Sequence, residues 1–148
     1  MESPSAEKTH AARYEMSTPA PAAATILCVE DEEAQLRLRK LLLESAGYQV
    51  LAARSGTQAL ELFRANPVDA VILDYFMPGM NGLTIAREMK QLDSRIPIII
   101  FSAYTSLPDE VIGTAEVWLR KAEIDPEDLL AHVRQLLERR SKQSDRRD

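Results

Sequence analysis

Short apolar runs alternate with amphipathic stretches along most of the chain. Runs of this kind, rich in β-branched residues, are typical of strands buried on both faces of a parallel sheet. They predict strands at residues 25–29, 48–52, 71–74, 96–101 and 116–119. Parallel neighbours need crossover connections, so the stretches between the runs are expected to be helices. The pattern predicts an α/β fold with a doubly wound, five-stranded parallel sheet.

The first helix is expected to bury one face and expose the other. Its apolar positions at helical spacing are Leu38, Leu41 and Leu42. The basic residues Arg37, Arg39 and Lys40 are expected on the opposite, solvent-facing side. This division follows the usual pattern of an amphipathic surface helix.

Several residues mark where the helices begin and end. Gly47 is placed to end the first helix as a C-terminal cap, and Ser55 is placed to cap the second, which ends before Pro67. A short helix is expected from 108 to 114, and Pro126 opens the last helix.

The composition changes at both ends of this pattern. Residues 1–24 are rich in Ala, Ser, Thr and Pro without sustained apolar periodicity, which predicts a disordered arm. Residues 25–140 form the predicted domain, and residues 141–148 form a charged C-terminal tail.

Composition narrows the classes of protein to consider. The net charge of -5 gives no support for direct contact with nucleic acid or an anionic membrane. Cys28 is the only cysteine, which excludes an intramolecular disulfide and favours a reducing compartment. No apolar stretch approaches the roughly 20 residues of a membrane span, and the polar N-terminal residues do not resemble a signal peptide. We therefore expect a cytoplasmic protein.

Polar side chains follow four of the predicted strands. Glu30 and Asp31 follow the first strand, Asp74 ends the third, Ser102 follows the fourth and Lys121 follows the fifth. Open α/β sheets place ligands at the carboxyl ends of their strands, so these groups are expected to converge. Three neighbouring carboxylates repel one another unless a cation or protons intervene. A hard divalent ion with oxygen ligands, Mg²⁺ above all, resolves that repulsion.

The same residues suit transfer of a phosphoryl group to a carboxylate. Asp74 would be the nucleophile, Lys121 would neutralise a phosphoryl oxygen and the Ser102 hydroxyl would donate to another. No histidine–acid pair offers hydrolase chemistry, because His10 lies in the arm and His132 on the last helix. The chain also lacks a glycine-rich nucleotide-binding motif.

Four segments together make the chain resemble a receiver domain of the two-component response regulators, over residues 25–140. They are residues 29–32 (VEDE), 73–82 (LDYFMPGMNG), 101–103 (FSA) and 119–121 (LRK). The resemblance implies a flavodoxin-like sheet of order 2-1-3-4-5 and Mg²⁺-dependent phosphorylation of Asp74. It also implies that the fourth helix, fifth strand and last helix form the surface that switches.

The resemblance implies a role for each matching residue. Glu30 and Asp31 match the acidic pair that holds the metal, and Asp31 is the expected direct ligand. Asp74 matches the phosphoryl acceptor, which is also a metal ligand. The Phe76 carbonyl matches a further metal contact. Ser102 matches the switch hydroxyl, Lys121 the catalytic lysine, and Trp118 the switch aromatic, with Tyr104 also near the switch.

The implied partners are a sensor histidine kinase or a histidine phosphotransfer protein, and a downstream protein target. Such a chain is not a conventional enzyme, because it catalyses only its own phosphorylation and slow dephosphorylation.

The sequence departs from the family pattern after the fourth strand. Ala122 follows Lys121 where the family usually has a cis proline; a cis bond to alanine would cost about 2.5–4 kcal/mol, so a trans bond is expected. Trp118 is bulkier than the usual Tyr or Phe. The segment from Ser102 to Lys121 is also short, which predicts a shortened fourth helix.

Other interpretations remain open. Asp74 alone is also consistent with a cap before the third helix, Ser102 with satisfying a local backbone group, and Lys121 with a solvated surface lysine. A receiver-like interaction module that works without phosphorylation is the main alternative function. A small phosphohydrolase with an aspartyl nucleophile is less favoured, since Phe76 occupies the position of its general acid.

Phe76 leads to one further hypothesis. It lies two residues beyond Asp74, where a polar side chain would help to orient a hydrolytic water. A phenylalanine ring can neither donate nor accept a hydrogen bond there, so we expect the phosphoaspartate to hydrolyse slowly.

Overall fold

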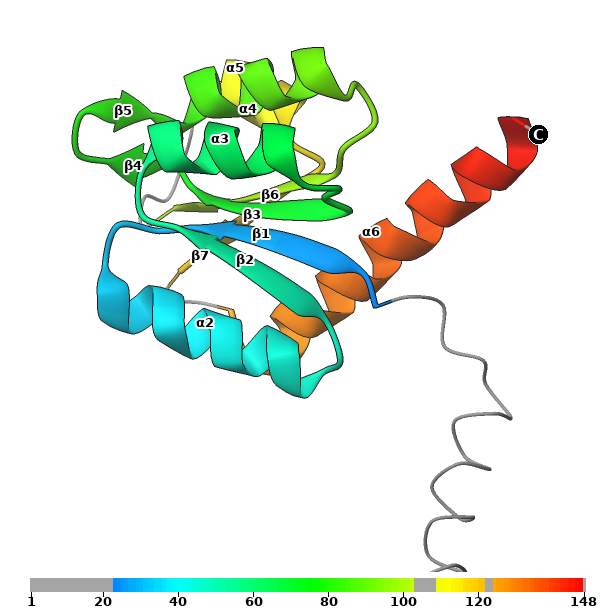
Figure 1. Ribbon diagram of the computed structural model, residues 1–148, viewed down its shortest axis with the longest axis horizontal. Helices are drawn as coiled ribbons and strands as arrows, with labels where there is room; N and C mark the ends of the chain where they lie inside the picture. The colour runs from blue at the N-terminus through cyan, green and yellow to red at the C-terminus, as the bar shows by residue number, and fades with distance from the viewer. Residues whose placement is uncertain (1–22, 103–108, 122–123, 148) are drawn as a thin grey trace, which may run out of the picture.

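The computed structural model describes residues 23–102, 109–121 and 124–147, which contain a five-stranded parallel sheet in the order β2-β1-β3-β6-β7 (Figure 1). The strands are β1 (Thr25–Val29), β2 (Gln49–Ala53), β3 (Ala70–Asp74), β6 (Ile98–Ser102) and β7 (Val117–Arg120). Counted along the sheet, this order is the predicted 2-1-3-4-5. The expected fold class and strand order are therefore confirmed, and the strand ends lie within two residues of the predicted ones.

In the part of the chain that the structure describes, five helices cover the two faces of the sheet. They are α2 (Glu33–Ser45), α3 (Gly56–Ala65), α4 (Gly82–Leu92), α5 (Asp109–Thr114) and α6 (Pro126–Arg147). Helices α3, α4 and α5 lie on one face, and α2 and α6 lie on the other (Figure 1). Each face has its own apolar core, and β1 contributes Leu27 and Val29 to one core and Ile26 and Cys28 to the other. The alternation of β1 side chains explains why its run is apolar throughout.

The central strands are fully covered, and their register aligns their carboxyl ends. All five residues of β3 and all five of β6 are buried. Leu73 pairs with Val29 on one side, and Asp74 pairs with Phe101 on the other. The residues that follow β1, β3 and β6 therefore lie at the same edge of the sheet.

The predicted helix-end signals are confirmed. Gly47 follows α2 with a φ of 99°, in the left-handed region that glycine adopts without a steric penalty. The Ser55 side chain accepts a hydrogen bond of 3.1 Å from the N–H of Gln58 at the start of α3. Pro126 is the first residue of α6, and the short helix α5 has six residues.

The predicted orientation of the first helix is only partly correct. Leu42 packs against the core and Arg37 is exposed, as expected, but other positions differ. Leu38 and Leu41 are 68% and 57% exposed, whereas Leu36 and Leu43 are buried. Arg39, expected in solvent, turns inward, and only 10% of its side chain is exposed. The buried face of α2 is therefore rotated away from the stripe that the leucine spacing indicated.

The prediction for the C-terminal end of the chain can be compared with the structure, but that for the N-terminal arm cannot. Helix α6 continues to Arg147, seven residues beyond the predicted domain boundary at Arg140, so residues expected in a charged tail extend the helix. Residues 1–22 of the predicted arm lie outside the described residues. Among the helices that are described, none combines the length and the apolarity needed to cross a membrane.

Candidate functional site

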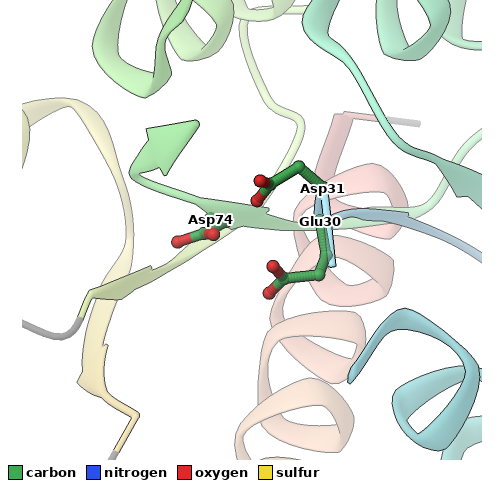
Figure 2. Close-up of side chains that lie close together, drawn as sticks. All are labelled: Glu30, Asp31 and Asp74. Carbon is green, nitrogen blue, oxygen red and sulfur yellow. The ribbon is translucent and has the colours of Figure 1, made fainter. Parts of the chain in front are cut away.

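Three carboxylates meet at the carboxyl edge of the sheet. Glu30 and Asp31 follow β1, and Asp74 is the last residue of β3 (Figure 2). One oxygen from each of the three side chains can be chosen so that all lie within 4.8 Å of one another. Glu30 and Asp74 are only 1% and 4% exposed, and Asp31 is half-buried. The predicted convergence of these three acids is present in the structure.

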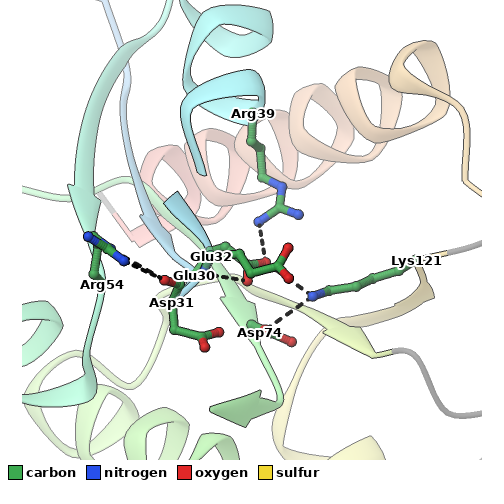
Figure 3. A network of polar contacts seen from close by, with 7 residues as sticks. All are labelled: Glu30, Asp31, Glu32, Arg39, Arg54, Asp74 and Lys121. Atoms are coloured by element: carbon green, nitrogen blue, oxygen red, sulfur yellow. Dashed lines mark hydrogen bonds and ion pairs between the residues drawn. The ribbon is translucent and has the colours of Figure 1, made fainter. Parts of the chain in front are cut away.

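Lys121, the residue directly after β7, contacts the same cluster. Its Nζ donates hydrogen bonds of 3.1 Å to Glu30 Oε1 and of 3.1 Å to Asp74 Oδ2 (Figure 3). The backbone N–H of Lys121 donates to the carbonyl of Ser102 at 2.9 Å, which continues the pairing of β6 with β7. The interpretation of Lys121 as an ordinary solvated lysine is therefore wrong. Its bond to Ala122 lies outside the described residues.

Glu30 is held in place by donors on both of its oxygens. Oε2 accepts the N–H of Glu32 at 3.2 Å, and Arg39 Nη1 lies 3.5 Å from Oε1, the oxygen that also contacts Lys121. Burial alone would raise the pKa of Glu30, but the Glu32 N–H, Lys121 and Arg39 together hold that pKa below its ordinary value. Glu30 is thus ionised and fixed in position by these contacts.

Asp74 is in the opposite situation. Burial first, and then the negative charge of Glu30, raise the pKa of Asp74 from its ordinary 3.8 to about 6, although Lys121 opposes the change. Burial also disfavours the charged form of Lys121, but its contacts with Glu30 and Asp74 raise its pKa overall. The lysine therefore stays cationic, while burial and Glu30 disfavour the ionised form of Asp74.

The residues present fit a hard divalent cation. Three carboxylates on two strand ends provide oxygen ligands, which Mg²⁺ prefers. The buried position of Asp74 and the negative charge of Glu30 beside it both raise its pKa. A cation in this position would favour the ionised form of Asp74.

The loop after Asp74 depends on a glycine. Gly82 donates its N–H to the carbonyl of Tyr75 at 3.0 Å, which closes the loop around the hairpin of β4 (Phe76–Met77) and β5 (Met80–Asn81). A Cβ at Gly82 would lie 2.7 Å from that same oxygen and 2.8 Å from the Tyr75 Cα. The Asn81 side chain then caps α4 by accepting the N–H of Leu83 at 2.7 Å. Asp74 is the last residue of β3, and the N-terminal cap of α4 is Asn81. The interpretation of Asp74 as that cap is therefore wrong.

Comparison with known proteins gives the same result as the geometry. The family model of the response regulator receiver domain matches residues 26–134, well over half of the chain. The chain belongs to the response regulator receiver domain family.

Solved receiver structures share the fold across nearly their whole length. A CheY-like response regulator receiver domain protein from Methanospirillum hungatei JF-1 is 25% identical, with a TM-score of 0.76 over 82% of this chain and 98% of that one. Response regulator protein TrrA from Thermotoga maritima, solved in complex with Mg²⁺-BeF, is 32% identical, with a TM-score of 0.71 over 76% of this chain and 98% of that one.

Curated relatives are longer. The uncharacterized transcriptional regulatory protein YkoG of Bacillus subtilis (strain 168) is 38% identical over 116 residues, which are 76% of this chain and 50% of that protein. Response regulator MprA of Mycobacterium sp. (strain KMS) is 36% identical over 119 residues, 78% of this chain and 51% of that protein. This receiver spans about half the length of the curated relatives it matches.

Two of the predicted switch residues, Ser102 and Trp118, lie on the β6–β7 side of the receiver. Ser102 is buried at the end of β6, opposite Arg120 in the register. Trp118 is half-buried and packs against the core that β3 and β6 share with α3 and α4. Its indole Nε1 is buried without a hydrogen-bond partner among the described residues. Tyr104 lies outside them, so its role near the switch stays a prediction.

Two arginines near the receiver site were not predicted from the sequence. Arg39 contacts Glu30, and Arg54 donates from Nε and Nη2 to the backbone carbonyl of Asp31 at 3.3 and 3.0 Å (Figure 3). No sequence signal marks either one, because a basic residue on a helix or beyond a strand is usually solvated. Phe76, which was predicted to lend a carbonyl to the metal, lies in the hairpin with its side chain 67% exposed.

Proposed function

We propose that this receiver accepts a phosphoryl group on Asp74 in a phosphorelay. The supporting observation is the convergence of Glu30, Asp31 and Asp74, within 4.8 Å, on a lysine that contacts two of them at 3.1 Å. Phosphoryl transfer requires little of a protein beyond positioning and charge stabilisation, and this cluster offers both. The membership of the chain in the receiver family supports the same function.

The reaction would proceed by in-line displacement at phosphorus. An oxygen of the Asp74 carboxylate forms the new P–O bond while the P–N bond of a phosphohistidine breaks, and the imidazole leaves with the electron pair of that bond. Mg²⁺ bound by Glu30, Asp31 and Asp74, with the Phe76 carbonyl as a further contact, would supply charge for the phosphoryl oxygens. That TrrA was solved with Mg²⁺-BeF supports this assignment.

Lys121 and Ser102 would respond to the new group. Phosphorylation replaces the single negative charge of the Asp74 carboxylate with a phosphoryl group of about -1.5 to -2 charges, so the site gains at most about one negative charge. The Lys121 ammonium, already 3.1 Å from Asp74, is placed to pair with a phosphoryl oxygen. The Ser102 hydroxyl, at the end of the neighbouring strand, is proposed to donate to another oxygen. Recruitment of these two groups would bias the surface of α5, β7 and α6, with Trp118 and Tyr104 taking part.

The partners follow from the chemistry. The donor is a phosphohistidine protein, either a sensor histidine kinase or a histidine phosphotransfer protein, and the acceptor of the signal is a protein that binds the switched surface. YkoG, named a transcriptional regulatory protein, and the DNA-binding response regulator MtrA are each about twice as long as the region they share with this receiver, so we extend no direct contact with nucleic acid to it. We place this chemistry in the cytoplasm.

Incubation with acetyl phosphate and Mg²⁺ tests the proposed function. Intact-mass spectrometry is expected to show the addition of one phosphoryl group to the wild-type chain, none to Asp74→Asn, and a strongly reduced amount to Lys121→Met. Arg37→Met, which removes an exposed cation from α2, is the matched control and should react as the wild type does. A wild-type chain that stays unmodified would instead support an interaction module that works without phosphorylation.

A further inference from the structure

Arg39 occupies an unusual position for a charged residue. It lies on α2, yet only 10% of its side chain is exposed, and its guanidinium carbon is 4.5 Å from the centroid of the Phe101 ring. Its neighbours on the same helix behave as surface residues do, since Arg37 pairs with Glu33 and Lys40 with Glu44 in solvent. Burying a guanidinium is costly unless it is paired. The compensating contacts of Arg39 are the aromatic face and Glu30.

Arg39 and Lys121 share one oxygen. Glu30 Oε1 lies 3.5 Å from Arg39 Nη1 and 3.1 Å from Lys121 Nζ, and the two cations approach it from different directions (Figure 3). Lys121 also contacts Asp74, whereas the only acid that Arg39 contacts among the described residues is Glu30. Arg39 therefore acts on the site through Glu30.

The charge balance of the site depends on Arg39. Three ionised carboxylates face two cations, which leaves one negative charge in excess. A divalent cation would turn that excess into one positive charge, and a phosphoryl group on Asp74, which adds about one negative charge, would then bring the site close to neutrality. Without Arg39, the site would be more negative by one charge throughout. Arg54 does not substitute for it, because Arg54 is 57% exposed and contacts the backbone of Asp31.

We propose that Arg39 is a positioning residue that opposes binding of the divalent cation and favours binding of the phosphoryl group once the cation is bound. Its charge competes with the cation for Glu30 and attracts the incoming anion. Arg39 consequently lowers the affinity of the site for the cation and raises the affinity of the cation-loaded site for the anion. This inference rests on the proposed function of the same site.

Two dissociation constants of the full chain test the proposal. The first is for Mg²⁺ alone, and the second is for beryllofluoride at saturating Mg²⁺, both measured by calorimetry. In Arg39→Met, we expect Mg²⁺ to bind roughly three- to tenfold more tightly and beryllofluoride to bind more weakly by a similar factor, as a unit charge a few ångströms away would produce. Arg39→Lys keeps the charge and should restore both constants to within about twofold of the wild type.

Controls separate this inference from general effects on folding. Arg37→Met makes the same substitution two residues away on the same helix and should change neither constant. Methionine at position 39 can pack against Phe101 and Leu42, which line the same groove as Arg39, so the variant is expected to fold. If thermal unfolding in EDTA shows that it does not, Arg39→Gln is tested by the same criteria.

The outcomes are distinct. If Arg39→Met leaves the ratio of the two affinities as it is in Arg37→Met, the proposal for Arg39 is wrong while the receiver chemistry stands. If the wild-type chain binds neither Mg²⁺ nor beryllofluoride, the proposed function itself fails.

Discussion

Replacing Asp74 with asparagine should stabilise the folded chain at neutral pH when no metal is present. In the wild type, burial and Glu30 raise the pKa of Asp74 from 3.8 to about 6, so its ionised form is disfavoured in the folded state. Asparagine has nearly the same shape and carries no charge. The substitution therefore removes a cost that the native residue carries because of its position in the site.

The size of the effect follows from the two pKa values. Each pKa unit corresponds to about 1.36 kcal/mol, so the difference between 3.8 and about 6 amounts to about 3 kcal/mol at pH 7.5. Asparagine also gives up the ionic part of the 3.1 Å contact with Lys121, which reduces the expected gain to about 1–3 kcal/mol. For a domain of this size, each kcal/mol raises the melting temperature by roughly 3–5 °C.

The pH dependence has a defined sign. Between pH 3.8 and about 6, the folded state binds more protons at Asp74 than the unfolded state, so the contribution of this residue to stability falls as the pH rises. The gap in free energy of unfolding between Asp74→Asn and the wild type should be small near pH 4, open between pH 4 and 6, and level off above pH 6. Added Mg²⁺ should narrow the gap by stabilising only the wild type.

Urea denaturation in EDTA at a series of pH values measures this gap. Glu61→Gln, which removes an exposed carboxylate from α3, is the control and should change the free energy of unfolding by less than about 0.5 kcal/mol at every pH. If Asp74→Asn destabilises the chain at pH 7.5, or if the gap does not vary between pH 4 and 6, the argument that burial and Glu30 disfavour the ionised form of Asp74 is wrong.

Three further substitutions test other parts of the structure. Gly82→Ala should destabilise the chain by about 2 kcal/mol or more in urea denaturation, since its Cβ would lie 2.7 Å from the Tyr75 carbonyl oxygen. Gly113→Ala is the control and should not, because its Cβ would meet nothing within 4 Å. Equal effects of the two substitutions would contradict the close approach at Gly82. Phe76→Asn should speed the loss of the phosphoryl group in Mg²⁺ several-fold, because a polar side chain can orient water; decay no faster than in the wild type would refute the hypothesis. Asp93→Asn should lower the free energy of unfolding by up to about 1 kcal/mol at pH 7. Burial alone would raise the pKa of Asp93, but the hydrogen bond from Arg140 and its other partners hold that pKa below 3.8, so the stabilisation is present above pH 3.8 and disappears as the pH falls. A cost that persists in acid would contradict this.

The sheet and the acidic cluster were predictable because each depends on local patterns. The apolar runs of β1 and β3 specify strands covered on both faces, and parallel register then brings Glu30, Asp31 and Asp74 to one edge. Lys121 was predicted for the same reason, as the residue that follows a strand of the same sheet. Ser55 and Pro126 marked helix starts through chemistry that is local to the helix end.

The orientation of α2 was not predictable in the same way. Leucines at helical spacing suggested a buried stripe, but Leu38 and Leu41 remain exposed while Arg39 points inward. What favours this rotation is a contact between distant segments, because the buried guanidinium finds Phe101 on β6 and Glu30 after β1. A helical arginine carries no sequence mark of such partners. The two-residue strands β4 and β5 were missed because they are too short to show a pattern.

The identity of the phosphorylated residue tests the account most directly. After reaction with acetyl phosphate and Mg²⁺, reduction with borohydride converts an aspartyl phosphate to a stable alcohol that peptide mass spectrometry can locate. The tryptic peptide of residues 65–87 contains two carboxylates, Asp69 and Asp74. We predict that the modification lies on Asp74 and is absent when EDTA replaces Mg²⁺. Modification at Asp69 or outside this peptide, or the same yield in EDTA, would contradict the claim that three acids and Lys121 form a metal-dependent phosphoryl-accepting site.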